Sequence, residues 1–297
     1  MRSPKDKIFD GMNILVLLFL SFITLYPFWN VAVISFNNAL DSIRGGIYFW
    51  PREFTWNNYI VLFENQAIPH AAMVSVLRTL ISVVAGVFVT AMVAYTISRR
   101  EYIFRKLVTT AFVLTMYFSG GLIPTYFLIR ELGMINSFSV YIIPGLIGAF
   151  NLIIIRTFIE GLPEGIIESA KIDGAGDFNV FMRVVFPLCM PVIATVSLFI
   201  AVGEWNDWFT TYLYNSSNAN LSTLQYELMK VLQSANASMS SSGSLATRLA
   251  NPNEEAAVTP NSIRAAMTIV ASLPIMLVYP FLQKYFVKGV MIGGVKE

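Results

Sequence analysis

The chain has 297 residues, of which 56% are hydrophobic and 13% are charged, and its mean hydropathy is +0.62. Because soluble domains carry about 25% charged residues, this composition excludes an ordinary soluble protein and predicts an integral membrane protein. The net charge of +2 does not support a nucleic-acid partner, and the single cysteine, Cys189, excludes a disulfide framework and a CxxC metal site.

Six apolar stretches are long enough to cross a bilayer, which takes about 20 mostly apolar residues per helix. They cover approximately residues 12–35, 72–97, 107–129, 138–158, 188–212 and 264–286. The first stretch is too long for a signal peptide and lacks a small-residue cleavage site at its end, so we interpret it as a retained anchor. Prolines within these stretches are compatible with membrane helices, because neighbouring helices satisfy the freed carbonyls. The sequence therefore predicts an all-α integral membrane protein with six transmembrane helices in one domain, residues 1–297.

The placement of Lys and Arg predicts the orientation of these helices, since basic residues gather in cytoplasmic loops. The firmest anchor is the cluster SRREYIFRK at residues 98–106. Placing both termini in the cytoplasm puts this cluster and the loop 159–187 inside the cell. The long segments 36–70 and 213–263 are then external. We expect a multi-pass protein of a bacterial plasma membrane.

The loop 159–187 carries carboxylates and glycines between two apolar stretches. Pro163 and Glu164 suit the first turn of a helix. Gly174 and Gly176 break that helix, because glycine adopts positive φ easily, and Asp177 is expected to cap a second short helix. The pattern predicts a helix–turn–helix whose small residues permit close approach of another protein. The alternative, from spacing alone, is an ordinary amphipathic interfacial loop.

Polar and aromatic residues cluster in GEWNDWF, residues 203–209, in the outer half of the fifth stretch. On a helix, Trp205 and Trp208 share one face, and Glu204 and Asp207 form its edge. Sugars stack on aromatic rings and hydrogen-bond to amides and carboxylates, and polar groups at membrane depth usually face a cavity. The alternative is an interfacial belt of tryptophans. The candidate residues for a sugar path are Tyr117, Asn151, Glu204, Trp205, Asn206, Asp207 and Trp208.

The segment ESAKIDGA, residues 168–175, with the downstream FMRVVFPLCMP, resembles the EAA signature of ABC-importer permeases, E-A-A-x-x-D-G-A. It departs from that signature at Ser169, a small residue in place of alanine. Three further segments, FSGGLIPTYFLIRELGMINS, GEWNDWF and FVKGVMIGGVKE, are similar to the maltose-type carbohydrate permeases. Within these, the chain resembles the oligo- and polysaccharide permeases of the LplC/YtcP type.

The resemblance implies a type I importer fold with cytoplasmic coupling helices. It also implies partners: a homologous second permease forming a heterodimer, two ATPase subunits that hold ATP and Mg²⁺, and an extracellular solute-binding lipoprotein. The residues that match the signature and would couple to the ATPase are Glu168, Ser169, Ala170, Asp173, Gly174 and Ala175. The sequence has no G-x-x-x-x-G-K-[ST] phosphate-binding loop. We therefore expect that the chain binds no cofactor, is not an enzyme and takes its energy from a partner.

Other functions compete with a sugar importer. Permease folds are shared more widely than ligands, so an importer for a non-sugar solute is one alternative. An ion-coupled secondary transporter would use Glu204 and Asp207 as a relay, but the middles of the other stretches lack ionisable groups to continue it, and the sequence shows no inverted repeat. A membrane enzyme is disfavoured because His70 is the only histidine and no Ser/His/Asp set is present.

Overall fold

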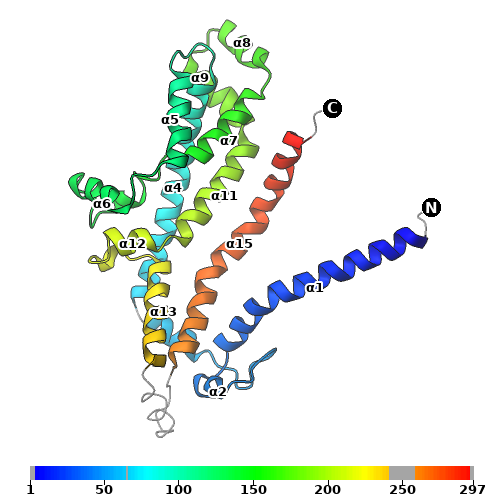
Figure 1. The fold of residues 1–297 in the computed structure, drawn as a ribbon, viewed down its shortest axis with the longest axis vertical. Coiled ribbons are helices and arrows are strands. Elements are labelled where there is room, and N and C mark those ends of the chain that lie inside the picture. Colours follow the sequence, from blue (N-terminus) through cyan, green and yellow to red (C-terminus); the bar gives the residue numbers. More distant parts are fainter. Residues whose placement is uncertain (1–3, 65, 241–257, 295–297) are drawn as a thin grey trace. The chain divides into compact units, whose positions relative to one another are not determined.

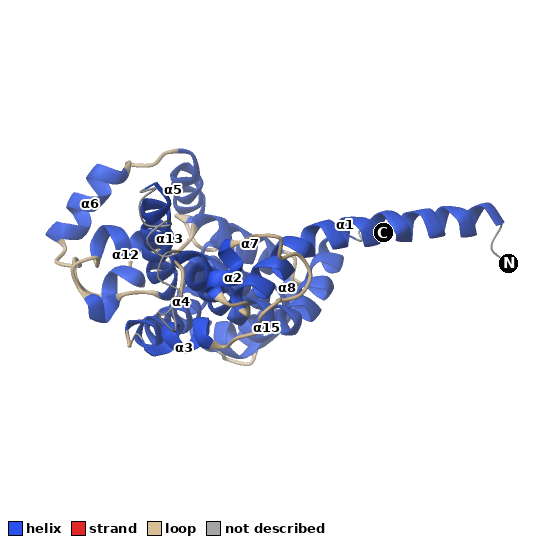
Figure 2. Ribbon diagram, turned by 90° about the horizontal axis from the view of Figure 1, so that it is seen from below, coloured by secondary structure: helices blue, strands red, loops and turns tan. Residues whose placement is uncertain are grey.

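The computed structural model describes residues 4–64, 66–240 and 258–294, and every regular element in these ranges is helical (Figures 1 and 2). The β pairing in the same ranges is a single isolated bridge between Asn37 and Phe54. The predicted all-α class is therefore confirmed. The chain divides into two compact units: Met1–Ile68 with Glu227–Leu273, and Pro69–Tyr226 with Pro274–Glu297.

The first unit contains three helices and parts of two more. They are α1 (Pro4–Ser35), α2 (Ala39–Ile43), α3 (Asn57–Glu64), most of α13 (Leu224–Ser240) and the first part of α15 (Pro260–Gly294). Two buried amides hold the turn that follows α1. Asn37 Nδ2 donates to the Asp41 carboxylate at 3.0 Å, and Asn58 Nδ2 donates to the carbonyls of Ser35 and Asn37 at 2.9 Å each. Such bonds satisfy backbone groups that the helix end leaves free.

The second unit contains the remaining helices, the end of α15 and the beginning of α13. In chain order they are α4 (Ala67–Ser98), α5 (Arg105–Tyr117), α6 (Leu122–Glu131), η1 (Phe138–Tyr141), α7 (Ala149–Glu160), α8 (Glu164–Ile172), α9 (Asp177–Val180), the π-helical η2 (Phe181–Val185), α10 (Phe186–Leu188), α11 (Met190–Asn206), α12 (Phe209–Tyr214) and η3 (Ala219–Leu221). Helix α7 packs against both α5 and α11, and α8 and α9 lie at one end of these helices (Figure 1).

The core of the second unit lies where α4, α7 and α11 meet the segment from α8 to η2. Leu152 and Ile155 of α7 and Val196 of α11 are fully buried there. Phe181 packs its ring 5.6 Å from that of Tyr95 on α4. Ile167 of α8 is 3% exposed and belongs to the same cluster. One apolar core therefore joins α8 to the long helices of the unit.

Two of the helices expected from the sequence, 107–129 and 138–158, are wrong as continuous helices. The first is interrupted between α5 and α6, where Gly121 adopts φ +84°. In the second, turns occupy the segment around Pro144 until α7 begins at Ala149. Glycine destabilises a helix and readily adopts the positive φ that ends it. Proline lacks the backbone N–H that a helix needs, and its ring clashes with the preceding turn.

The helix expected over 188–212 is also broken. Helix α11 ends at Asn206 and α12 begins at Phe209. At its other end, the segments Asp177–Leu188 and Met190–Asn206 meet at 81°. Pro191 lies just after this bend, and its lack of an N–H prevents the helix from continuing regularly through it.

Among the described residues, three single helices are long and apolar enough to cross a membrane: Lys5–Ser35, Ala67–Ser98 and Pro260–Val278. The bent pair Asp177–Leu188 and Met190–Asn206 raises the number to four if it forms one crossing. Pro27 and Pro274 lie inside two of these helices, in agreement with the expected tolerance of proline.

Candidate functional site

The first candidate region is the turn between α8 and α9. Two backbone hydrogen bonds close it: Gly174 N–H donates to the Lys171 carbonyl and Ala175 N–H to the Ala170 carbonyl, both at 3.0 Å. This pair of bonds forms a Schellman motif, whose turning residue adopts the left-handed conformation that glycine favours. Gly174 has φ +82°. The predicted helix–turn–helix is therefore present, and the D-G-A order gives the residue that ends α8, the residue that turns the chain and the residue that closes the turn.

The signature residues divide between two faces of this turn. Ala170 and Ala175 are partly buried and pack, near Ile167, against the core of the second unit. The exposed signature residues are Glu168, Ser169, Asp173 and Gly174. Helix α8 is thus fixed on one side by apolar contacts, and it presents two carboxylates on the other side.

Exposed apolar side chains flank the same turn. Ile172 is 85% exposed and Phe178 is 62% exposed. Contiguous apolar surface beside polar groups marks sites of protein contact. The outward face of the turn therefore combines carboxylates, a small residue and apolar side chains.

Lys171 connects the turn to the loop that follows α4. Its amine lies 3.2 Å from the Asp177 carboxylate and 3.6 Å from that of Glu101. The hydrogen bond to Asp177 raises the pKa of Lys171, because it favours the charged amine. The expectation that Asp177 caps α9 is wrong: Gly176 occupies the cap position, and Asp177 is the first helical residue.

The second candidate region surrounds Arg78, a residue of α4 that is 2% exposed. Arg78 Nε donates to the Glu204 carboxylate at 2.7 Å, Nη1 donates to the Asp207 carbonyl at 2.9 Å, and Nη2 donates to the Asp207 carboxylate. Charge-assisted bonds of this kind are about twice as strong as neutral ones. Arg78 thereby fastens α4 to the break that follows α11.

A tyrosine extends this contact into a polar network. The Arg78 guanidinium carbon lies 4.5 Å from the centroid of the Tyr141 ring, a cation–π geometry. The Tyr141 hydroxyl donates to the Leu221 carbonyl at 2.6 Å and bonds Thr211 Oγ1 at 3.0 Å, and Thr211 in turn bonds Thr223 Oγ1 at 2.9 Å. The network therefore joins α4, η1, α12 and the segment after α12.

The helical face predicted for Trp205 and Trp208 is wrong, because α11 ends between them. Trp205 is 7% exposed, whereas Trp208 packs its ring 5.7 Å from Phe209 and 6.0 Å from Tyr212. Asn206 is exposed and donates to the carbonyl of Val202. The structure brings Glu204 and Asp207 together through Arg78 and separates the two tryptophans.

The other two candidate residues for the sugar path lie on different helices. Tyr117 ends α5 and is 79% exposed. Asn151 is partly buried in the first turn of α7, with its side chain folded against Gly148. Neither residue bonds to the Arg78 network.

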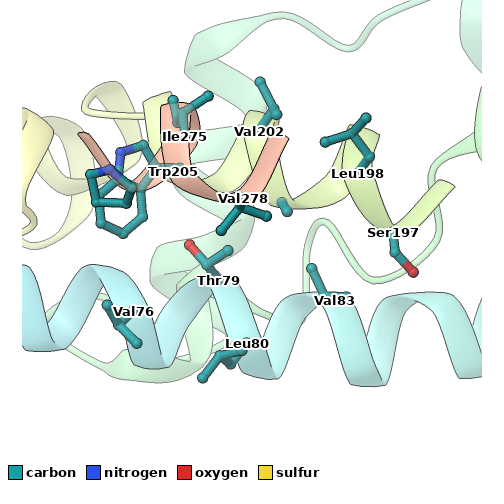
Figure 3. A pocket seen from close by; sticks show the side chains of 12 residues that line it. Val76, Thr79, Leu80, Val83, Ser197, Leu198, Val202, Trp205, Ile275 and Val278 are labelled. Atoms are coloured by element: carbon teal, nitrogen blue, oxygen red, sulfur yellow. The ribbon is translucent and has the colours of Figure 1, made fainter. Parts of the chain in front are cut away.

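A cavity of about 320 Å³ lies beside Trp205, within the second unit. Its lining comes from α4, α11 and the end of α15, and Figure 3 shows Trp205, Ile275 and Val278 opposite Thr79 and Leu80. The lining side chains are apolar except for Thr79, Ser197 and the indole N–H of Trp205. Because sugars need many hydrogen-bond partners, this cavity suits apolar groups better than a saccharide.

Arg78 is the functional residue that the sequence patterns did not indicate. A signal was available. An arginine inside an apolar stretch needs a carboxylate partner, and Glu204 and Asp207 are the only acidic residues within the six predicted stretches.

Comparison with known proteins covers almost the whole chain. The family model described as "Binding-protein-dependent transport system inner membrane component" matches residues 7–292. Two relatives from Bacillus subtilis (strain 168) are each 36% identical: the polygalacturonan/rhamnogalacturonan transport system permease protein YtcP and Protein LplC. The matches cover 98% and 99% of this chain and 99% and 97% of those proteins.

A solved structure also matches this fold. It is described as a bacterial ABC transporter involved in the import of the acidic polysaccharide alginate. The TM-score is 0.84 and the identity is 23%, and the match covers 96% of this chain and 99% of that one. At this identity the likeness establishes the fold alone.

We expect Arg78→Gln to lower the free energy of unfolding by about 3–5 kcal/mol, because it leaves two partly buried carboxylates without their cation. The triple variant R78Q/E204Q/D207N removes all three charges and should be more stable than R78Q alone. Denaturant unfolding of the purified protein in detergent measures both values.

Arg100→Gln is the matched control for this series. Arg100 lies 3.8 Å from Glu164, and both side chains are exposed, at 78% and 47%, so its loss should cost no more than about 1 kcal/mol. Equal stabilities of R78Q and R100Q would contradict the role given to Arg78.

Proposed function

The chain belongs to the family of binding-protein-dependent transport system inner membrane components, and we propose that it is the permease subunit of an ATP-driven importer for an oligo- or polysaccharide. Its likeness to YtcP, whose name gives polygalacturonan and rhamnogalacturonan as substrates, supports a carbohydrate. The family comprises membrane components, so ATP hydrolysis is assigned to partner subunits.

The observation that carries the mechanism is the capped turn between α8 and α9. Its outward face offers Glu168 and Asp173 beside a glycine that a partner surface can approach closely. Its inward face holds Ile167 in the same core as α4, α7 and α11. In the proposed mechanism, α8 and α9 are coupling helices seated in the ATPase subunit. Closure of the ATPase then displaces α8, and the shared core passes this displacement to the long helices as a rigid-body motion.

In the proposed topology, the chain is one permease domain with six crossings. Helices α1, α4 and α15 make continuous crossings, the bent pair makes a fourth, and α5 with α6 and η1 with α7 make two interrupted ones. Interrupted helices are tolerated at membrane depth where the protein itself provides hydrogen-bond partners for their free backbone groups. Arg78 is such a partner, because it donates to the Asp207 carbonyl. Both termini and the loop 159–187 are cytoplasmic, and 36–70 and 213–263 are external.

The proposed assembly contains a homologous second permease, two ATPase subunits that hold ATP and Mg²⁺, and an extracellular solute-binding lipoprotein, in a bacterial plasma membrane. Sugar passes Tyr117, Asn151, Asn206 and Trp208, whose rings and amides offer stacking surfaces and hydrogen bonds. Glu204 and Asp207 contribute to this path indirectly, by holding Arg78 in place. Trp205 contributes by forming part of the wall of the apolar cavity.

Uptake into proteoliposomes that contain the whole complex tests the function. Labelled oligogalacturonide and the binding protein are outside, ATP is inside, and an uncoupler collapses the ion gradients. We expect uptake that requires ATP and survives the uncoupler. Uptake that persists without ATP and stops with the gradient would overturn the importer in favour of a secondary transporter. ATP-dependent uptake of a non-sugar solute alone would overturn the substrate class.

We expect Gly174→Val to reduce ATP-dependent uptake roughly tenfold or more, because a β-branched residue at φ +82° strains the turn by about 1–3 kcal/mol. Gly176→Val is the matched control, since Gly176 has φ −69° and space for a side chain, as Gly174 also has. Uptake is measured at equal amounts of chain in the membrane. Equal activities of the two variants would show that the turn has no role in coupling.

A further inference from the structure

A second cavity, of about 230 Å³, is polar and lies among the end of α4, the loop to α5, the end of α7 and the start of α8. Three arginines line it: Arg99, Arg100 and Arg105. Two glutamates, Glu160 and Glu164, also line it. All of these residues belong to the second unit. The cavity lies apart from the Arg78 network and from the outward face of the α8–α9 turn.

The glutamates of this cavity are already paired with arginines. Arg156 donates to Glu160 from Nε at 3.0 Å and from Nη2 at 2.8 Å. Glu164 lies 3.8 Å from Arg100, whose side chain is 78% exposed, which makes this pair a weak one. The Arg105 side chain has no ion pair or hydrogen bond within the described part of the chain. The cavity therefore keeps an excess of positive charge after its own carboxylates are counted.

Arg99 presents an unsatisfied donor in the same place. Its side chain is 15% exposed, and its Nη2 lies 3.5 Å from Glu101. Its Nε is buried and has no hydrogen-bond partner among the residues that the structure describes. A buried donor of a charged group is unfavourable when it lacks an acceptor. Arg99 lines the cavity, and its guanidinium therefore has fewer acceptors around it than it has donors.

Apolar side chains are exposed along the loop to α5 and in the first turn of α5. Ile103 is 88% exposed, Phe104 57% and Leu107 67%, and they lie on either side of Arg105 in the sequence. A basic cavity next to exposed apolar side chains matches an amphiphile with an anionic head and an apolar tail. A free inorganic anion would use only the first of these features.

We propose that this cavity binds the phosphate of an anionic phospholipid headgroup. Arginine forks bind phosphate oxygens in pairs, and basic pockets at the cytoplasmic ends of membrane helices suit lipid headgroups. Glu164 and Ile167 of α8 line the same cavity, so a bound headgroup lies between the start of α8 and the ends of α4 and α7, with the Glu164 carboxylate as an unfavourable neighbour that the arginines must outweigh. The inference rests on the proposed topology, which puts this cavity at the cytoplasmic ends of the helices, and it does not depend on which solute is transported.

Native mass spectrometry of the full-length chain in detergent tests the proposal. The protein is titrated with phosphatidylglycerol, with phosphatidylcholine of the same acyl chains and with inorganic phosphate. We expect phosphatidylglycerol to bind at least about tenfold more tightly than phosphatidylcholine, since each arginine near the headgroup contributes several-fold. The variant R100Q/R105Q should lose this preference.

The control variant R130Q/R183Q removes the same charge at two exposed arginines outside the cavity, and it should keep the preference for phosphatidylglycerol. Unfolding temperatures in lipid-free detergent check that the variants fold. If R100Q/R105Q does not fold, Arg105→Gln replaces it, because its side chain has no ion pair to lose in the described structure. An unchanged preference in the cavity variant, or an equal loss in the control, would overturn the proposal.

Inorganic phosphate distinguishes the source of the anion. Binding of phosphate as tightly as phosphatidylglycerol would identify a free-anion site and would overturn the lipid. Each of these readouts counts bound molecules without any transport, so a failure of the lipid proposal leaves the ATP-dependent uptake unaffected, and the reverse also holds.

Discussion

The structure of the break after α11 depends on the hydrogen bonds that the buried guanidinium of Arg78 donates to Glu204 and Asp207. A helix that stops among apolar residues leaves backbone groups that lipid cannot satisfy. Arg78 satisfies one of these backbone groups, because its guanidinium donates to the Asp207 carbonyl as well as to the carboxylates of Asp207 and Glu204. The carboxylates in turn keep the arginine from being an unpaired buried charge. Burying the Arg78 guanidinium without the carboxylates, or the carboxylates without Arg78, would be unfavourable. This mutual requirement explains why three charged residues lie within apolar stretches of the sequence.

The apolar core of the second unit connects this polar region to the α8–α9 turn. Helices α4 and α11 are joined at Arg78 through charge, and both contribute buried residues, such as Ala94 and Ile193, to the same apolar core. Ile167 of α8 enters the same core. Because packed cores resist deformation, the turn and the long helices are expected to move together, and the carboxylates of α8 stay outside the core for a partner to reach.

The sequence predicted the features that depend on local chemistry. The all-α class follows from composition, and the turn at Gly174 follows from the position of one glycine after a helix. It did not predict where helices break, because proline and glycine inside apolar stretches are compatible with both outcomes: α1 continues through Pro27, whereas the segment at Pro144 does not form a helix. The pairing of Arg78 with residues more than a hundred positions away was missed, because helix periodicity relates only neighbours along one element.

Cross-linking in the assembled importer tests most directly whether the α8–α9 turn meets the ATPase. Two variants, Ser169→Cys and Ser217→Cys, are made in a Cys189→Ser background, and both positions are exposed. The new thiol of each variant is labelled with a short thiol-to-amine cross-linker. The account predicts that the Ser169 position forms an adduct with the ATPase subunit and that the Ser217 position, in the proposed external loop, forms none. An adduct from Ser217, or none from Ser169 in a complex that transports, would contradict it.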